Sequence, residues 1–341
     1  MNNQRKQYVG LNAIRGMAAI LVMLYHYTIR YNENPLTSMY SIDWFITFDW
    51  GCAAVSTFFI LSGFLGSKHL LQTGNLRGVF SFYLNRIVRL YPSFWICLII
   101  TSIVSFGFFP NCSLTLKDVV KNATMFPNYF GAKYIDGAYW TLQVEWTFYI
   151  ICGGLLLFGS IIYKRILLEA WLAISILIDY LCLYNPNIPF IGVVSSVVAA
   201  PHAQEFLSGV AIYFLLINKR DLRAWTLLAL CFAKQIYFSD SAHSIVYIIS
   251  LIIIYCIVCF DIECVFKNRF AKFLCWYGSI SYPFYLLHQM IGFAILKTCV
   301  ENGWNRPAII VLPFLLITLL SYVIHKYIEI PIINYHKQKV K

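Results

Sequence analysis

The sequence predicts an all-α integral membrane protein with about ten transmembrane helices and both termini in the cytoplasm. Apolar residues make up 60% of the 341 residues and charged residues only 12%, whereas soluble domains carry roughly a quarter charged residues. The apolar stretches are long and continuous rather than alternating, which favours helices over a transmembrane barrel. Lysines and arginines are unevenly distributed among the connections between these stretches.

Each predicted span is close to the length of about 20 residues that crosses the hydrocarbon core as a helix. The spans cover roughly 11–30, 50–70, 92–109, 140–162, 166–184, 201–217, 223–238, 244–260, 274–297 and 308–328. The proline-containing stretch 185–202 is the least regular connection, and a re-entrant segment there would change the count. Two connections are long, a basic inner one over about 71–91 and an outer one over about 110–139. We expect a single membrane domain over residues 1–341.

The basic residues set the predicted orientation. With the N-terminus inside, 18 of the 26 lysines and arginines lie on the cytoplasmic side and 7 on the outer side, while Arg15 lies within the first span. Basic cytoplasmic loops face anionic lipid, which accounts for the net charge of +11 without a nucleic-acid partner. The eleven cysteines show no zinc-binding spacing, so no metal is expected. We expect a multi-pass protein of a cell membrane.

Arg15 and His26 are two ionisable residues within the first span. Such groups are costly in hydrocarbon and indicate a functional site. Eleven positions at about 100° each return His26 to within about 20° of Arg15, about 16 Å further along the helix. One helix face would then carry a fixed positive charge and, nearer the outer end, a titratable base. A structural histidine that bonds a neighbouring helix is the alternative for His26.

Arg86 and Arg89 lie at the inner entrance to the third span. Their spacing places them on one helix face, where two guanidinium groups could bind phosphate oxygens. Ordinary topology charge is the alternative. Because Arg15 lies at a similar depth, the three arginines indicate an anionic ligand that enters from the cytoplasm.

The fourth span begins with aromatic residues and an acid. Glu145 lies about 7 Å inside the outer end, a depth similar to that of His26, so its carboxylate could orient the imidazole. Tyr139, Trp140 and Tyr149 could form a platform for a sugar ring or an interfacial belt. His288, on a helix that Pro283 is expected to kink, is a further intramembrane imidazole. Because it has no evident partner, a structural role is as well supported for it as a functional one.

Together these segments resemble the acyltransferase-3 family of membrane acyltransferases. The matching pieces are Arg15 with His26, the stretch 58–64, Arg86-Ile-Val-Arg89, Trp140-Thr-Leu-Gln-Val-Glu145, the run 281–288 and Glu329-Ile-Pro331. They cover almost the whole chain in order. The family motif in the fourth span more often reads Glu-Glu-x-Phe-Tyr, and Trp146 replaces its second acid here, so no role of that carboxylate carries over.

The resemblance implies an O-acyltransferase with acetyl-CoA as the acyl donor and no metal. The acyl group, most often acetyl, would pass to a hydroxyl of an extracytoplasmic sugar in a surface polysaccharide such as O-antigen, or in a glycolipid, at a bacterial inner membrane. The expected site residues are His26 and Glu145 for catalysis, Arg15, Arg86 and Arg89 for the CoA phosphates, and Tyr139, Trp140 and Tyr149 for the acceptor.

Two other functions are compatible with the composition. A carrier could export a lipid-linked sugar or polysaccharide, but such proteins are usually built from internal repeats, and none is evident in this chain. A scaffolding role in polysaccharide assembly would leave Arg15, His26 and Glu145 without a task. The sequence therefore favours the enzyme.

Overall fold

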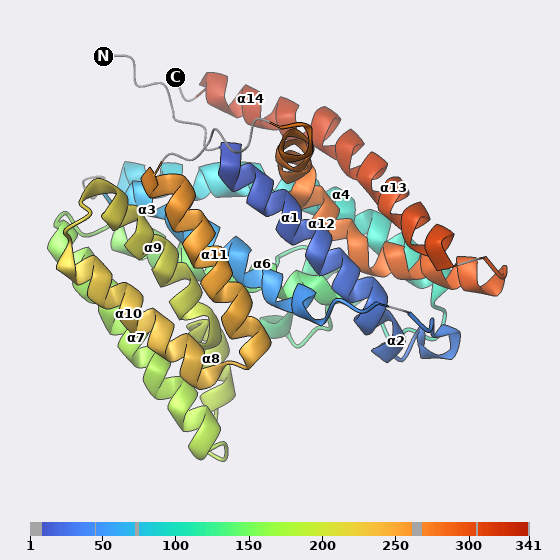
Figure 1. Ribbon diagram of the computed structural model, residues 1–341, viewed down its shortest axis with the longest axis horizontal. Coiled ribbons are helices and arrows are strands. Elements are labelled where there is room, and N and C mark those ends of the chain that lie inside the picture. Colours follow the sequence, from blue (N-terminus) through green and yellow to red (C-terminus); the bar gives the residue numbers. More distant parts are fainter. Residues whose placement is uncertain (1–8, 45, 72–74, 261–267, 305, 340–341) are drawn as a thin grey trace. The chain divides into compact units, whose positions relative to one another are not determined.

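The described part of the chain is helical, and no strand occurs in it (Figure 1). The computed structural model describes residues 9–44, 46–71, 75–260, 268–304 and 306–339. The α-helices are α1 (Val9–Tyr25), α2 (Tyr31–Glu33), α3 (Val55–Leu70), α4 (Leu76–Phe108), α5 (Leu116–Asn122), α6 (Trp140–Leu155), α7 (Ile161–Tyr184), α8 (Ile191–Val197), α9 (Ala203–Ile217), α10 (Leu222–Phe238), α11 (Ser241–Phe260), α12 (Arg269–Glu301), α13 (Arg306–Ile324) and α14 (Ile330–Lys339). Two π-helical turns, His26–Arg30 and His325–Glu329, follow α1 and α13. The all-α prediction is confirmed.

Seven helical stretches among the described residues are long and apolar enough to cross a membrane. They are Val9–Glu33, Asp49–Leu70, Leu76–Phe108, Ile161–Tyr184, Ser241–Phe260, Arg269–Glu301 and Ile309–Lys339. The other three predicted spans coincide with α6, α9 and α10, which have 16, 15 and 17 residues. The protein therefore has several membrane-spanning candidates, while the count of about ten and the cytoplasmic termini stay predictions.

The basic connection expected over about 71–91 is helical from Leu76 onward. Asn75 caps this helix, since its side-chain oxygen accepts the N–H of Gly78. Arginine and leucine are good helix formers, and Pro92 is tolerated inside α4. The arginine motif thus lies on a 33-residue helix that includes the third span. The irregular stretch 185–202 holds the short helix α8, which packs against α7.

The chain resolves into two compact units, which are described separately below. The first comprises Met1–Arg15, Ala53–Tyr83 and Val144–Trp276, and the second comprises Gly16–Cys52, Leu84–Gln143 and Tyr277–Lys341. The boundaries fall within α1, α4, α6, α12 and the 3₁₀-helix Asp49–Ala54. The expectation of a single domain over residues 1–341 stays a prediction.

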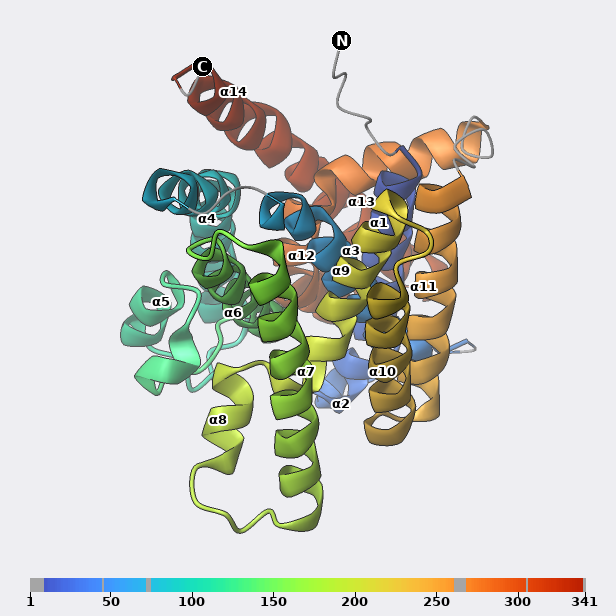
Figure 2. The ribbon, with the colours of Figure 1, turned by 90° about the vertical axis from the view of Figure 1, so that its left-hand side faces the viewer.

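The first unit is a bundle in which α9 packs against α3, α7, α10 and α11 (Figure 2). Glycines permit the close crossing of α3 and α9. A Cβ atom at Gly63 would lie 2.0 Å from the carbonyl oxygen of Phe206, and one at Gly209 would lie 2.0 Å from that of Ile60. Small residues commonly bring membrane helices into this kind of backbone contact. The second unit contains the π-helical turn after α1, most of α4 and α12, and helices α5, α13 and α14.

Candidate functional site

Two imidazole rings meet in the second unit. His26 begins the π-helical turn that continues α1, and His288 lies on α12 beyond Pro283. Nδ1 of His26 is 2.6 Å from Nε2 of His288, and the ring centroids are 4.7 Å apart. His288 is 1% exposed. The structure thus supplies the partner that the sequence did not reveal, and we call His26 and His288 the histidine pair.

The hydrogen-bond pattern assigns the protons of the histidine pair. Nδ1 of His288 lies 2.7 Å from the carbonyl oxygen of Tyr285, and because a carbonyl only accepts, this nitrogen carries the proton. Nε2 of His288 is then an acceptor, and Nδ1–H of His26 donates to it. The remaining nitrogen, Nε2 of His26, keeps its lone pair. The neutral pair therefore presents one nitrogen that can accept a proton or attack a carbonyl carbon.

This chain of hydrogen bonds resembles the one that orients a catalytic histidine in hydrolase triads. There, a carboxylate accepts the Nδ1–H bond and fixes the tautomer of the imidazole. Here, the neutral ring of His288 takes that position, and the carbonyl of Tyr285 fixes His288 in turn. When Nε2 of His26 gains a proton, its Nδ1–H bond to His288 remains in place.

A π-helical turn and a close helix contact hold the histidine pair. The N–H of Tyr31 bonds to the carbonyl of His26, five residues back, which is the π-helical pattern. The hydroxyl of Tyr27 donates to the carbonyl oxygen of His288 at 2.9 Å. Gly292 permits this approach, since a Cβ atom there would lie 2.2 Å from the Tyr27 hydroxyl oxygen. The turn that carries one histidine thus bonds directly to the backbone of the other.

Two side chains from the end of the long outer connection bond to the backbone of α12. Asp136 accepts the N–H of Met290 at 2.9 Å through Oδ2, and Tyr139 donates to the carbonyl oxygen of Leu286 at 3.1 Å. In a regular helix this N–H and this carbonyl would bond to each other. Asp136 and Tyr139 therefore bond to the donor and the acceptor of the same helical hydrogen bond. His288 lies between these two residues of α12 in the sequence.

Asp136 is fully buried, and its second oxygen accepts the N–H of Ala138 at 2.8 Å. Burial raises the pKa of Asp136 to about 7, while the two backbone hydrogen bonds act in the opposite direction. The sequence analysis did not select Asp136. Tyr139, expected on a sugar platform, is 2% exposed, and acceptor binding by it stays a prediction.

Glu145 lies on α6 in the first unit and accepts two hydroxyl groups. Ser62 donates to its Oε1 at 2.8 Å, and Tyr149 donates to the same oxygen. Tyr149 is 6% exposed and its ring packs edge-to-face on Trp146. The prediction that Glu145 orients His26 stays a prediction, as does acceptor binding by Trp140 and Tyr149.

The arginine motif lies on α4, where Arg86 and Arg89 are both partly buried and one turn apart. Both belong to the second unit. Arg15 is also partly buried but belongs to the first unit. Two guanidinium groups on one helix face suit a phosphate group. Phosphate binding by these residues stays a prediction.

Hydrogen bonds connect α4 to α12 directly and also through Tyr139, which lies on the turn Gly137–Tyr139. Tyr282 donates to the carbonyl oxygen of Leu90 at 2.9 Å, and the hydroxyl oxygen of Tyr139 is 3.3 Å from Oγ1 of Thr101. Thr101 lies about 18 Å beyond Arg89 along the helix axis at a rise of 1.5 Å per residue. Tyr139 also bonds to α12 in the turn that carries His288, so this one side chain joins the two helices.

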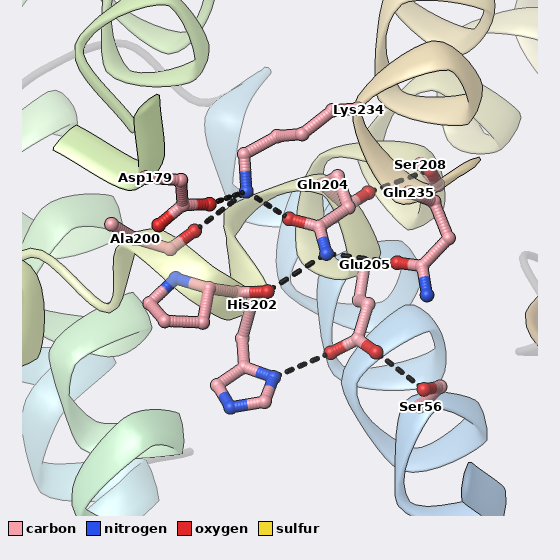
Figure 3. Close-up of polar contacts among 10 residues, drawn as sticks. Ser56, Asp179, Ala200, His202, Gln204, Glu205, Ser208, Lys234 and Gln235 are labelled. Atoms are coloured by element: carbon pink, nitrogen blue, oxygen red, sulfur yellow. Dashed lines mark hydrogen bonds and ion pairs between the residues drawn. The ribbon is translucent and has the colours of Figure 1, made fainter. Parts of the chain in front are cut away.

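A buried polar network joins the helices of the first unit (Figure 3). Lys234, one of the seven lysines and arginines predicted on the outer side, is 3% exposed and forms an ion pair with Asp179 at 2.6 Å. Its Nζ also donates to Oε1 of Gln204 at 2.6 Å, and Glu205 accepts a hydrogen bond from Ser56. The network ties α3, α7, α9 and α10 together, and its polar groups satisfy one another as buried groups must. We assign it a structural role.

No group of three or more His, Cys, Asp or Glu side chains among the described residues could hold a metal ion. No curated protein and no solved structure matches the chain. The family described as an acyltransferase domain does match, over residues 8–326. This range contains the histidine pair, the arginine motif and Glu145. The chain therefore belongs to the acyltransferase-3 family and is a multi-pass membrane acyltransferase.

Proposed function

We propose that the protein transfers an acyl group, most commonly acetyl, from cytoplasmic acyl-CoA to a hydroxyl group of an extracytoplasmic sugar. The observation that carries this proposal is the histidine pair, with its single unprotonated nitrogen on His26. O-acylation needs a base for the acceptor hydroxyl. A partly buried imidazole with a fixed tautomer, in a membrane protein of this family, meets that need.

In the proposed reaction, Nε2 of His26 takes the proton of the acceptor hydroxyl as its oxygen attacks the thioester carbonyl. The carbon–sulfur bond then breaks, and the leaving CoA sulfur takes the proton back from Nε2. In the alternative route, Nε2 first attacks the thioester carbonyl, the carbon–sulfur bond breaks and CoA leaves as the thiolate. The acceptor hydroxyl then attacks the acyl-imidazolium, the carbon–nitrogen bond breaks, and the hydroxyl proton passes to the CoA thiolate. In both routes His288 holds the Nδ1–H bond of His26 throughout.

The other predicted residues complete the proposal. Arg86 and Arg89 would bind the CoA phosphates. Arg15, which the sequence places at a similar depth, would be a third cationic group for these phosphates. Glu145, with its two hydroxyl partners, is retained as a second catalytic group. Tyr139, Trp140 and Tyr149 would bind the acceptor. We propose that this acceptor is a surface polysaccharide such as O-antigen, or a glycolipid, at a bacterial inner membrane.

The test is reconstitution of the protein in lipid with isotopically labelled acetyl-CoA, followed by mass spectrometry of the host's surface carbohydrate. We expect labelled O-acetyl groups with the wild type and none with His26→Ala. His243→Ala is the matched control, because His243 forms an exposed pair with Asp240 instead. Transfer by a folded His26→Ala variant would remove His26 from the mechanism. An inactive wild type that moves a lipid-linked sugar would instead identify a carrier.

A further inference from the structure

The amide of Gln289, next to His288 on α12, has no hydrogen-bond partner in the described part of the chain. Gln289 is 5% exposed, and its Oε1 is buried and unpaired. Leaving a buried polar atom unpaired costs free energy, so such atoms are rare and need an explanation. The backbone groups around it already have partners. The carbonyls of Leu286 and His288 accept hydrogen bonds from tyrosine hydroxyl groups, and the N–H of Met290 donates to a carboxylate.

The amide is packed beneath the end of the outer connection. A Cβ atom at Gly137 would lie 2.7 Å from Nε2 of Gln289 and 3.0 Å from Oε1, so a glycine leaves the space that the amide occupies. Asp136 and Tyr139, on either side of Gly137, are anchored to the same turn of α12. The unpaired amide therefore lies between the histidine-bearing helix and the outer segment.

We propose that Gln289 binds the sugar acceptor and that its Oε1 accepts a hydrogen bond from a sugar hydroxyl. This inference rests on the proposed function. A carboxamide accepts through oxygen and donates through nitrogen, which matches the neighbouring hydroxyl groups of a sugar. An amide N–H of the CoA arm is the other group that could donate a hydrogen bond to Oε1 of Gln289. The position beneath the outer segment favours the sugar, because the acceptor is expected from that side.

The test compares two glutamines that differ in their bonding. Gln289→Leu removes an unpaired amide, whereas Gln204→Leu removes a buried amide that bonds to Pro201, Lys234 and Gln235. In thermal unfolding without substrates, we expect Gln289→Leu to raise the melting temperature and Gln204→Leu to lower it. A lowered melting temperature for both variants would assign Gln289 a structural role and overturn the proposal.

Kinetics then separates the two possible donors. With the host's surface carbohydrate fraction as acceptor, we expect Gln289→Leu to raise the half-saturating amount of carbohydrate about tenfold, the effect of one lost hydrogen bond to substrate. KM for acetyl-CoA should not change. A rise in KM for acetyl-CoA alone would assign the amide to the CoA arm and overturn the proposal. Unchanged kinetics beside an active wild type would refute this inference only, whereas an inactive wild type would refute the proposed function as well.

Discussion

Replacing His288 by phenylalanine removes both hydrogen bonds of its imidazole while it keeps a planar ring. His26 then loses the acceptor that lies 2.6 Å from its Nδ1, and part of the population carries the proton on Nε2, where His26 cannot act as a base. We expect kcat to fall about 10- to 100-fold, as when other partners that orient histidines are removed. This corresponds to about 1.4 to 2.7 kcal/mol of transition-state stabilisation. The loss should be smaller than the roughly 10⁴-fold effect in triads with a charged carboxylate, because His288 is neutral.

The assay is the release of CoA thiol from acetyl-CoA by the protein in lipid nanodiscs, with the host's surface carbohydrate fraction as acceptor. KM for acetyl-CoA should not change. His288→Gln restores an accepting oxygen, so its kcat should lie between those of the wild type and His288→Phe. His243→Phe, in an exposed pair, should leave kcat unchanged. A folded His288→Phe variant with wild-type kcat would refute the assignment of the histidine pair.

Three further substitutions test a buried carboxyl group, the arginine motif and the close crossing of α3 and α9. Asp136→Asn places an NH₂ group against a backbone N–H, and we expect it to lower the free energy of unfolding by about 1–3 kcal/mol in denaturant titrations. Because the pKa of Asp136 is raised from 3.8 to about 7, the folded state holds this proton more tightly, so wild-type stability should fall as pH rises across that interval and the Asn variant should lack this component. Arg86→Ala should raise KM for acetyl-CoA about tenfold without lowering kcat, and an equal effect of Arg77→Ala, on the exposed start of α4, would point to general topology charge. Gly209→Ala places a Cβ atom 2.0 Å from the carbonyl of Ile60 and should cost about 1–3 kcal/mol of stability; an unchanged melting temperature would contradict the close crossing of α3 and α9.

The helices could be predicted from the sequence because long apolar stretches are a local signal. Each predicted span coincides with a helix, and Gly63, within the stretch 58–64, lies at the close crossing of α3 and α9. The start of α4 was missed because hydropathy marks the part of a helix that lies in hydrocarbon. Residues 76–91 are more polar, yet their helix propensity extends the same helix.

The partners within the site could not be predicted because they are distant in the chain. His26 and His288 are 262 residues apart, and no local pattern indicates which intramembrane groups meet. Pairing the two intramembrane imidazoles that lacked partners would have been a usable signal. Asp136 gave no such signal, since an aspartate in a polar connection is usually solvated. The sequence counts Lys234 among the outer charges, and its ion pair with Asp179 is visible only in the packed bundle.

The pairing of two imidazoles has a consequence for how a base can be kept inside a bilayer. A carboxylate in the position of His288 would add a permanent negative charge, which apolar surroundings disfavour strongly. In the arrangement of His26, His288 and the Tyr285 carbonyl, every participant is uncharged at rest. Charge develops only while a proton is in transit, so the resting molecule avoids the solvation cost of a buried ion.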